Sequence, residues 1–194
     1  MKLNKVNLKI KKYKAKELDL GSQRLLAKLL VHKLTGKELR HSKTGRPFVS
    51  RDLDVSISHK DKIVCVATIR SPYRIGIDVE NLNINLNINN FFGSIIARDE
   101  ELFLIKFCKR KKISQTSGVV TLWSIKESFF KCLDYDLKPG KLSIKNILNN
   151  GRVFLNFPDD IRALIKKRGL VYCFTKIQFF EEYVCSETIM KKIN

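Results

Sequence analysis

The sequence WSIKESFFK, residues 123–131, lies in a stretch whose apolar residues recur at helical spacing. With successive residues about 100° apart, one side carries Leu122, Ile125, Phe129 and Leu133, which predicts a helix over residues 119–133. Glu127, Lys131 and Ser124 fall on roughly the opposite side. Glu127 and Lys131 are one turn apart, so they form either a solvated ion pair worth roughly 0.3–0.5 kcal/mol or part of an active site.

Outside this helix, the pattern predicts antiparallel strands and two further helices. Strands are expected at residues 3–10, 54–59, 62–70, 74–80, 141–148, 152–157, 170–179 and 183–189, and helices at about 19–34 and 94–109. Asn149-Asn150-Gly151 is typical of a hairpin turn. The Asn-rich residues 81–90 predict an irregular linker near the middle of the chain, between an N-terminal half, 1–88, and a C-terminal half, 89–194. The predicted fold class is α+β.

Two acidic residues end the strand RIGIDVE, residues 74–80. Residues i and i+2 of a strand point to the same face, so Asp78 and Glu80 stand side by side. Like charges so close are unfavourable unless a cation offsets them, and Mg²⁺ prefers carboxylate oxygens and water. Two solvated acids at the end of a strand would give the same spacing, so the pattern alone leaves both interpretations open.

Composition narrows the class of protein. The 194 residues carry 38 Lys and Arg against 19 Asp and Glu, a net charge of +19, which suggests an anionic partner such as nucleic acid, an acidic protein, a membrane surface or a phosphorylated small molecule. The five cysteines are odd in number and form no CxxC motif, which argues against a disulfide framework or a zinc site. Residues 1–14 lack the apolar core of a signal peptide, and no run approaches the roughly 18 apolar residues of a membrane helix. We therefore expect a cytoplasmic protein that does not enter the membrane.

Four short motifs follow one another along the chain. They are Gly45-Arg46-Pro47, Ser56-x-Ser58-His59, Gly76–Glu80 (GIDVE) and Trp123–Lys131. Their order resembles that of the 4'-phosphopantetheinyl transferase superfamily, in the longer single-chain type that includes the surfactin-synthetase-activating enzyme. The resemblance runs from about Gln23 to Leu142, and its most specific part is the pair GIDVE and WSIKESFFK. It implies a monomeric pseudo-dimer of two similar α+β halves, with coenzyme A in the cleft between them.

The resemblance also implies a reaction and a set of site residues. A serine hydroxyl of an apo acyl, polyketide or peptidyl carrier protein would attack the phosphate of coenzyme A that bears pantetheine, and 3',5'-ADP would leave. The implied magnesium ligands are Asp78, Glu80 and Glu127, with Mn²⁺ as a possible substitute. The implied catalytic residues are Glu127 as base, Lys131 beside the pyrophosphate, and Asp78. Coenzyme A would be held by Arg24, Gly45, Arg46, Pro47, Ser58, His59 and Lys131.

Two features depart from the family pattern. Arg46 stands where the family usually has lysine, which keeps the charge but changes the reach. The N-terminus looks shorter than in many relatives, so Lys9, Lys11, Lys12 or Lys14 are alternatives for holding the 3'-phosphate.

Other classes of protein explain less of the sequence. A basic nucleic-acid-binding protein would account for the charge and for Lys109–Lys112, but no helix-turn-helix, zinc-finger or RNP1-like pattern is present. A metal-dependent nuclease would use the acids, although many such enzymes need an acid-x-Lys on one strand. A purely structural basic protein leaves all four motifs as coincidence. We therefore expect no nucleic-acid partner.

Overall fold

The computed structural model describes residues 6–12, 19–84, 93–135 and 139–193. Its helices are α1 (Leu20–Thr35), α3 (Glu101–Lys111), α4 (Gln115–Leu133) and α5 (Asp159–Lys167), with short 3-10 turns at Arg98–Glu100 and Pro139–Lys141. Its strands are β1 (Asn7–Lys12), β2 (Arg40–His41), β3 (Pro47–Ser50), β4 (Leu53–Lys60), β5 (Ile63–Arg70), β6 (Tyr73–Asn81), β7 (Ser143–Ile147), β8 (Arg152–Asn156), β9 (Leu170–Phe180) and β10 (Tyr183–Lys192).

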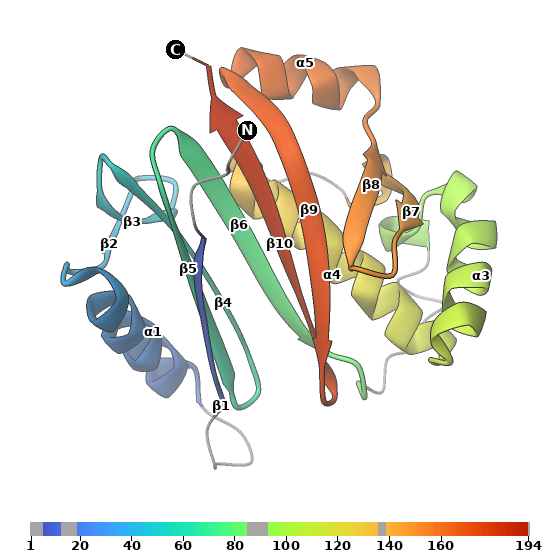
Figure 1. The fold of residues 1–194 in the computed structure, drawn as a ribbon, viewed down its shortest axis with the longest axis horizontal. Coiled ribbons are helices and arrows are strands. Elements are labelled where there is room, and N and C mark those ends of the chain that lie inside the picture. The colour runs from blue at the N-terminus through green and yellow to red at the C-terminus, as the bar shows by residue number, and fades with distance from the viewer. Residues whose placement is uncertain (1–5, 13–18, 85–92, 136–138, 194) are drawn as a thin grey trace.

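In the described residues, these strands form two five-stranded antiparallel sheets. The first has the order β1-β5-β4-β3-β2 and the second β6-β10-β9-β8-β7. Figure 1 shows α1 beside the first sheet and α4 running along the second. Each half therefore combines one sheet with a long helix, which confirms the predicted α+β fold.

Three apolar layers hold these elements together. Ala27, Leu30 and Val31 of α1 pack against one face of the first sheet. The opposite face of β5 packs against β6 and β10 of the second sheet. On α4, the predicted apolar side Leu122, Ile125, Phe129 and Leu133 is completely buried. Both faces of β5 are covered, so its residues need not alternate between apolar and polar. This explains why its sequence IVCVATI is almost continuously apolar.

Polar side chains of β4 join the two sheets. The backbone N–H groups of Ile75 and Ile77 donate to Asp54 Oδ2 (2.8 Å) and Ser56 Oγ (2.9 Å), and that of Val79 donates to Ser58 Oγ (3.2 Å). β6 is an edge strand of its sheet, so these side chains satisfy donors that would otherwise lack a strand partner. We call this row of contacts the β4–β6 seam.

Most of the predicted elements are present, with several differences. In place of the helix expected over 94–109, α3 begins only at Glu101, after a 3-10 turn. Helix α4 begins at Gln115, four residues before its predicted start, and α5, β2 and β3 were not predicted. Residues 85–90 of the expected Asn-rich linker lie outside the described residues. The division at residue 88 stays a prediction, and β6, which precedes it, is hydrogen-bonded into the sheet of the C-terminal half.

The five cysteines are free in the structure. In the described part of the chain, none of the helices has the length and apolar character needed to cross a membrane.

Candidate functional site

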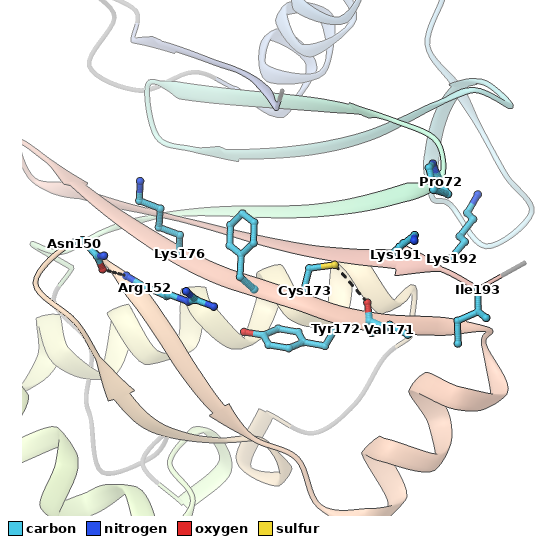
Figure 2. A pocket seen from close by; sticks show the side chains of 11 residues that line it. Pro72, Asn150, Arg152, Val171, Tyr172, Cys173, Lys176, Lys191, Lys192 and Ile193 are labelled. Carbon is cyan, nitrogen blue, oxygen red and sulfur yellow. Dashed lines mark hydrogen bonds between the residues drawn. The ribbon is translucent and has the colours of Figure 1, made fainter. Parts of the chain in front are cut away.

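Of the two cavities described here, only the smaller one is lined by predicted site residues. A cavity of about 1040 Å³ follows β9, and none of the predicted residues lines it (Figure 2). A smaller pocket of about 330 Å³ lies between the halves, and Gly45, Arg46, Pro47, Glu127 and Lys131 are among its lining residues. The structure therefore brings the loop at 45–47 and the WSIKESFFK helix, about 80 residues apart, to one place.

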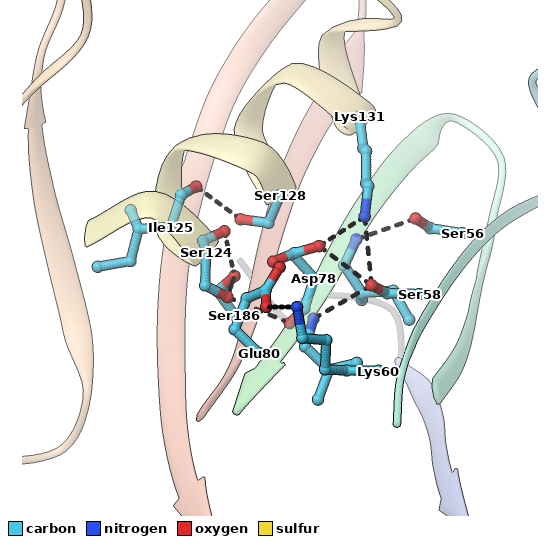
Figure 3. A network of polar contacts seen from close by, with 12 residues as sticks. Ser56, Ser58, Lys60, Asp78, Glu80, Ser124, Ile125, Ser128, Lys131 and Ser186 are labelled. Atoms are coloured by element: carbon cyan, nitrogen blue, oxygen red, sulfur yellow. Dashed lines mark hydrogen bonds and ion pairs between the residues drawn. The ribbon is translucent and has the colours of Figure 1, made fainter. Parts of the chain in front are cut away.

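Beside this pocket, Lys131 bridges a strand of each sheet. Its Nζ donates to Asp78 Oδ1 (2.6 Å) and to Ser58 Oγ (3.2 Å), as Figure 3 shows. Ser58 Oγ donates in turn to Asp78 Oδ1 (3.0 Å). Asp78 is almost fully buried, and its second oxygen, Oδ2, has no hydrogen-bond partner among the described residues. The cluster thus has one carboxylate oxygen fully engaged and one available to a further donor or cation.

Glu80 lies next to Asp78 and pairs with a lysine that the sequence reasoning missed. Lys60 Nζ is 2.9 Å from Glu80 Oε2. Burial raises the pKa of Glu80, and the negative charge of Asp78 raises it further, while Lys60 opposes both. The sequence could have indicated Lys60, because Lys60 continues the polar residues at every second position of β4, after Asp54, Ser56 and Ser58.

His59 sits among positive charges at the end of β4. Burial lowers the pKa of His59, and the charges of Lys131 and Arg24 lower it further, while Asp78 raises it. Arg24, exposed on α1, is therefore within electrostatic reach of the cluster, and its implied role in holding coenzyme A stays a prediction. At neutral pH, this environment favours the uncharged imidazole.

Arg46 binds protein groups rather than facing the solvent. Its guanidinium donates to Asp54 Oδ2 (2.7 Å), to the carbonyl of Ile75 (3.3 Å) and to the carbonyl of Lys131. The preceding Gly45 has a left-handed backbone (φ 81°), which permits the turn that delivers Arg46. Arg46 thus ties the loop to β4, β6 and the C-terminal end of α4. Its predicted role at the nucleotide stays a prediction.

Gly76 of the GIDVE motif explains how closely α4 approaches β6. A Cβ at this position would lie 2.0 Å from the carbonyl oxygen of Ser128 and 2.4 Å from the backbone nitrogen of Cys132. Only glycine fits, because both neighbours are backbone atoms that cannot rotate away. This contact lets Lys131, on the same helical turn as Ser128, reach Asp78, two residues after Gly76.

The predicted position of Ser124 was wrong. Ser124 does not face solvent with Glu127 but is fully buried, sharing hydrogen bonds with Ser186 of β10. The buried side of α4 is wider than Leu122, Ile125, Phe129 and Leu133 suggest, because β6 and β10 cover small polar residues as well.

Lys126 was also missed, and it forms a buried ion pair. Lys126 Nζ donates to Glu100 Oε2 (2.5 Å) and to the carbonyl of Ile95 (2.7 Å), and neither charged side chain is exposed. Glu100 also accepts from the N–H groups of Ala97 and Ile144, both at 2.7 Å. Burial raises the pKa of Glu100 and lowers that of Lys126, and each partner's charge opposes the shift of the other. The pair anchors the face of α4 adjacent to Glu127.

The predicted metal ligands are only partly assembled. Glu127 is half-buried and lines the pocket, while Asp78 and Glu80 are paired with lysines. Across the residues that the structure describes, no three His, Cys, Asp or Glu side chains are grouped to hold one metal ion. The assignment of Asp78, Glu80 and Glu127 to a metal stays a prediction.

Comparison with known proteins identifies the family. Residues 74–185, which include both GIDVE and WSIKESFFK, match the model of the 4'-phosphopantetheinyl transferase superfamily. The chain belongs to this superfamily. Over 127 residues it is 30% identical to the 4'-phosphopantetheinyl transferase gsp of Aneurinibacillus migulanus, an alignment that covers 65% of this chain and 45% of that protein. The chain thus spans less than half the length of this curated relative.

Solved structures of holo-acyl-carrier-protein synthases share the transferase fold. The enzyme of Plasmodium yoelii superposes with a TM-score of 0.51 at 20% identity, over 62% of this chain and 95% of that one. The enzyme of Neisseria meningitidis gives 0.52 at 17% identity, over 61% and 98%. At these identities, the likeness concerns the fold alone.

Proposed function

We propose that this chain transfers 4'-phosphopantetheine from coenzyme A to a serine of an apo carrier protein and releases 3',5'-ADP. Family membership supports the proposal, and one observation carries it. Lys131, Asp78 and Ser58 meet where α4, β6 and β4 converge, beside a pocket shared by Glu127 and the loop at Gly45. Phosphoryl transfer depends mainly on positioning and on stabilising charge, and a junction of charged groups supplies both.

The carboxylates of this junction fit a hard divalent cation. Asp78 Oδ2 is buried without a hydrogen-bond partner among the described residues, and the charge of Asp78 raises the pKa of its neighbour Glu80. A cation would satisfy the oxygen and offset the repulsion. We assign Asp78, Glu80 and Glu127 to Mg²⁺, for which Mn²⁺ is a substitute. When bound, the metal would neutralise negative charge on the pyrophosphate.

The remaining roles follow from position and charge. Glu127, on the pocket wall, accepts the proton of the attacking serine. Lys131 stabilises charge on the pyrophosphate and the leaving nucleotide. Ser58 and His59 contact the phosphates, and Arg24 adds positive charge on the same side.

Arg46 acts first as a positioning residue for the loop Gly45–Pro47, because its guanidinium already binds Asp54 and the carbonyls of Ile75 and Lys131. The nucleotide then lies against this loop.

The partners follow from the proposed reaction. The acceptor is an apo acyl, polyketide or peptidyl carrier protein, and an acidic carrier would be attracted by the net charge of +19. The two sheets within one chain favour a monomer, and we place the reaction in the cytoplasm.

Intact mass spectrometry of an apo carrier protein tests the proposal. We expect incubation with this protein, coenzyme A and Mg²⁺ to add one phosphopantetheine group, and EDTA to abolish the addition. Glu127→Gln should lose the activity with its fold intact, while Lys109→Ala, on the exposed side of α3, should keep it. An unmodified mass across acyl, polyketide and peptidyl carriers, together with salt-sensitive retention on DNA, would favour the nucleic-acid-binding alternative.

A further inference from the structure

The cavity along β9 has no part in the proposed reaction. It lies on the C-terminal half, and we call it the β9 cavity (Figure 2). It is defined by Arg152 of β8, by Tyr172, Phe174 and Lys176 of β9, and by Lys191 and Lys192 of β10. Its volume of about 1040 Å³ reaches the upper end of the range of roughly 300–1,000 Å³ typical of small-molecule sites.

All charged side chains that line the β9 cavity are cations. Arg152 lies directly opposite Lys176 in the β8–β9 register, and like charges in such a position are unfavourable. Glu187 faces Lys176 from β10, so this row across the sheet holds two cations and one carboxylate. An anion bound in the cavity would offset the remaining positive charge.

Tyr172 does not offer its hydroxyl to such an anion. Its ring packs against Phe129 of α4 and against Phe157, whereas Phe174 packs against the apolar cluster of β5, β6 and β10. The hydroxyl is buried, and hydrogen bonding with Thr175 opposes the rise that burial gives to its pKa. The cations Arg152 and Lys176 are therefore left to hold the anion.

Most of the remaining lining is apolar, with Asn150 at the Arg152 end. Phe174, Pro72 and Ile193 contribute carbon surface, and Figure 2 shows Pro72 and Ile193 at the end that carries Lys191 and Lys192. We propose that the β9 cavity binds a small organic anion: Arg152 and Lys176 hold its phosphate, sulfate or carboxylate group, and Phe174 contacts its aromatic or aliphatic body. This site is separate from the proposed transferase reaction and does not depend on it.

Binding of 8-anilinonaphthalene-1-sulfonate, an aromatic sulfonate whose fluorescence rises in apolar sites, tests the proposal on the full chain. We expect Arg152→Ala to weaken binding about tenfold, the effect of losing one charge-assisted hydrogen bond. Lys176→Ala removes the cation opposite Arg152 and should also weaken binding. Lys109→Ala, which removes an exposed charge on α3, should bind the probe like the wild type.

Cys173 gives a local readout because it lines the cavity and is partly exposed. The bound probe should slow alkylation of Cys173 but not of Cys108, which is also partly exposed and lies on α3. Octanoate and adenosine monophosphate, as competitors, distinguish an aliphatic carboxylate from an aromatic phosphate. Unchanged affinity in both cavity variants, or unchanged reactivity of Cys173, would overturn the proposal.

Discussion

At the scale of single residues, the environment of His59 makes the binding of an anion sensitive to pH. The ordinary pKa of 6.5 is lowered by burial and by the charges of Lys131 and Arg24, and Asp78 acts in the opposite direction. Phosphates placed beside His59 would favour the charged imidazole and raise this pKa. We therefore expect coenzyme A binding to take up a proton and to become tighter as pH falls towards about 6.

Calorimetry in two buffers of different ionisation enthalpy measures this proton uptake. His59→Gln should abolish it, whereas Lys109→Ala should leave it unchanged. If the wild type binds coenzyme A without taking up a proton, His59 does not contact the phosphates.

The same reasoning gives the effect of His59 on folding. Its pKa is lower in the folded protein than in the unfolded chain, so the unfolded chain binds more protons between the two values. Through this residue, the free energy of unfolding decreases as pH falls through 6.5 and below.

The buried pair of Lys126 and Glu100 governs stability rather than binding. Lys126→Met would leave the Glu100 carboxylate buried without its countercharge, which typically costs about 3–5 kcal/mol. Urea unfolding should show this loss, while Lys109→Met, at an exposed position, should stay within about 0.5 kcal/mol of the wild type.

The double variant Lys126→Met/Glu100→Leu, which removes both charges, should recover part of the loss. A single variant as stable as the wild type would mean that the pair is not buried in solution.

At the scale of elements, α4 approaches Gly76 of β6 so closely that no side chain fits between them. Gly76→Ala would force a methyl group into backbone atoms of Ser128 and Cys132, and overpacking of this kind costs about 1–3 kcal/mol or more. Any movement of α4 that relieves the clash also separates Lys131 from Asp78. We therefore expect both a lower free energy of unfolding and a loss of transferase activity.

Gly93→Ala is the matched control, because nothing lies within 4 Å of a Cβ there and no positive φ is involved. It should be neutral in both assays. A stable and active Gly76→Ala variant would show that the spacing between α4 and β6 is unimportant.

The sequence predicted these elements better than it predicted their contacts. Apolar spacing indicated the helix around WSIKESFFK, and alternation indicated the strand with Ser56 and Ser58, because both patterns are local. The β4–β6 seam depends on a strand about 20 residues away, and the pair of Glu100 and Lys126 on residues 26 apart. Nothing in the local pattern around Lys126 distinguishes a lysine with a buried partner from a solvated one.

At the scale of the whole molecule, two halves of similar build were easier to predict than the boundary between them. The polar run 81–90 suggested a boundary after β6, yet β6 pairs with β10, a strand from the far end of the chain. Pairing over about 110 residues leaves no local trace in the sequence. The seam keeps β6 in contact with both sheets, which places Asp78 where residues from both halves reach it.

The net charge of +19 also acts over the whole molecule. If the acceptor is an acidic carrier protein, long-range attraction speeds the encounter, and salt screens it over a Debye length of about 10 Å at 0.1 M. With coenzyme A saturating, we expect kcat/KM for the carrier to fall steeply as ionic strength rises. We expect kcat to change little, because Asp78 is buried and Lys131 is paired with it at 2.6 Å. Steady-state rates at increasing salt measure both constants. A kcat/KM that does not respond to salt would mean that the positive charge serves another partner, and retention on DNA over the same range of salt would then identify nucleic acid as that partner.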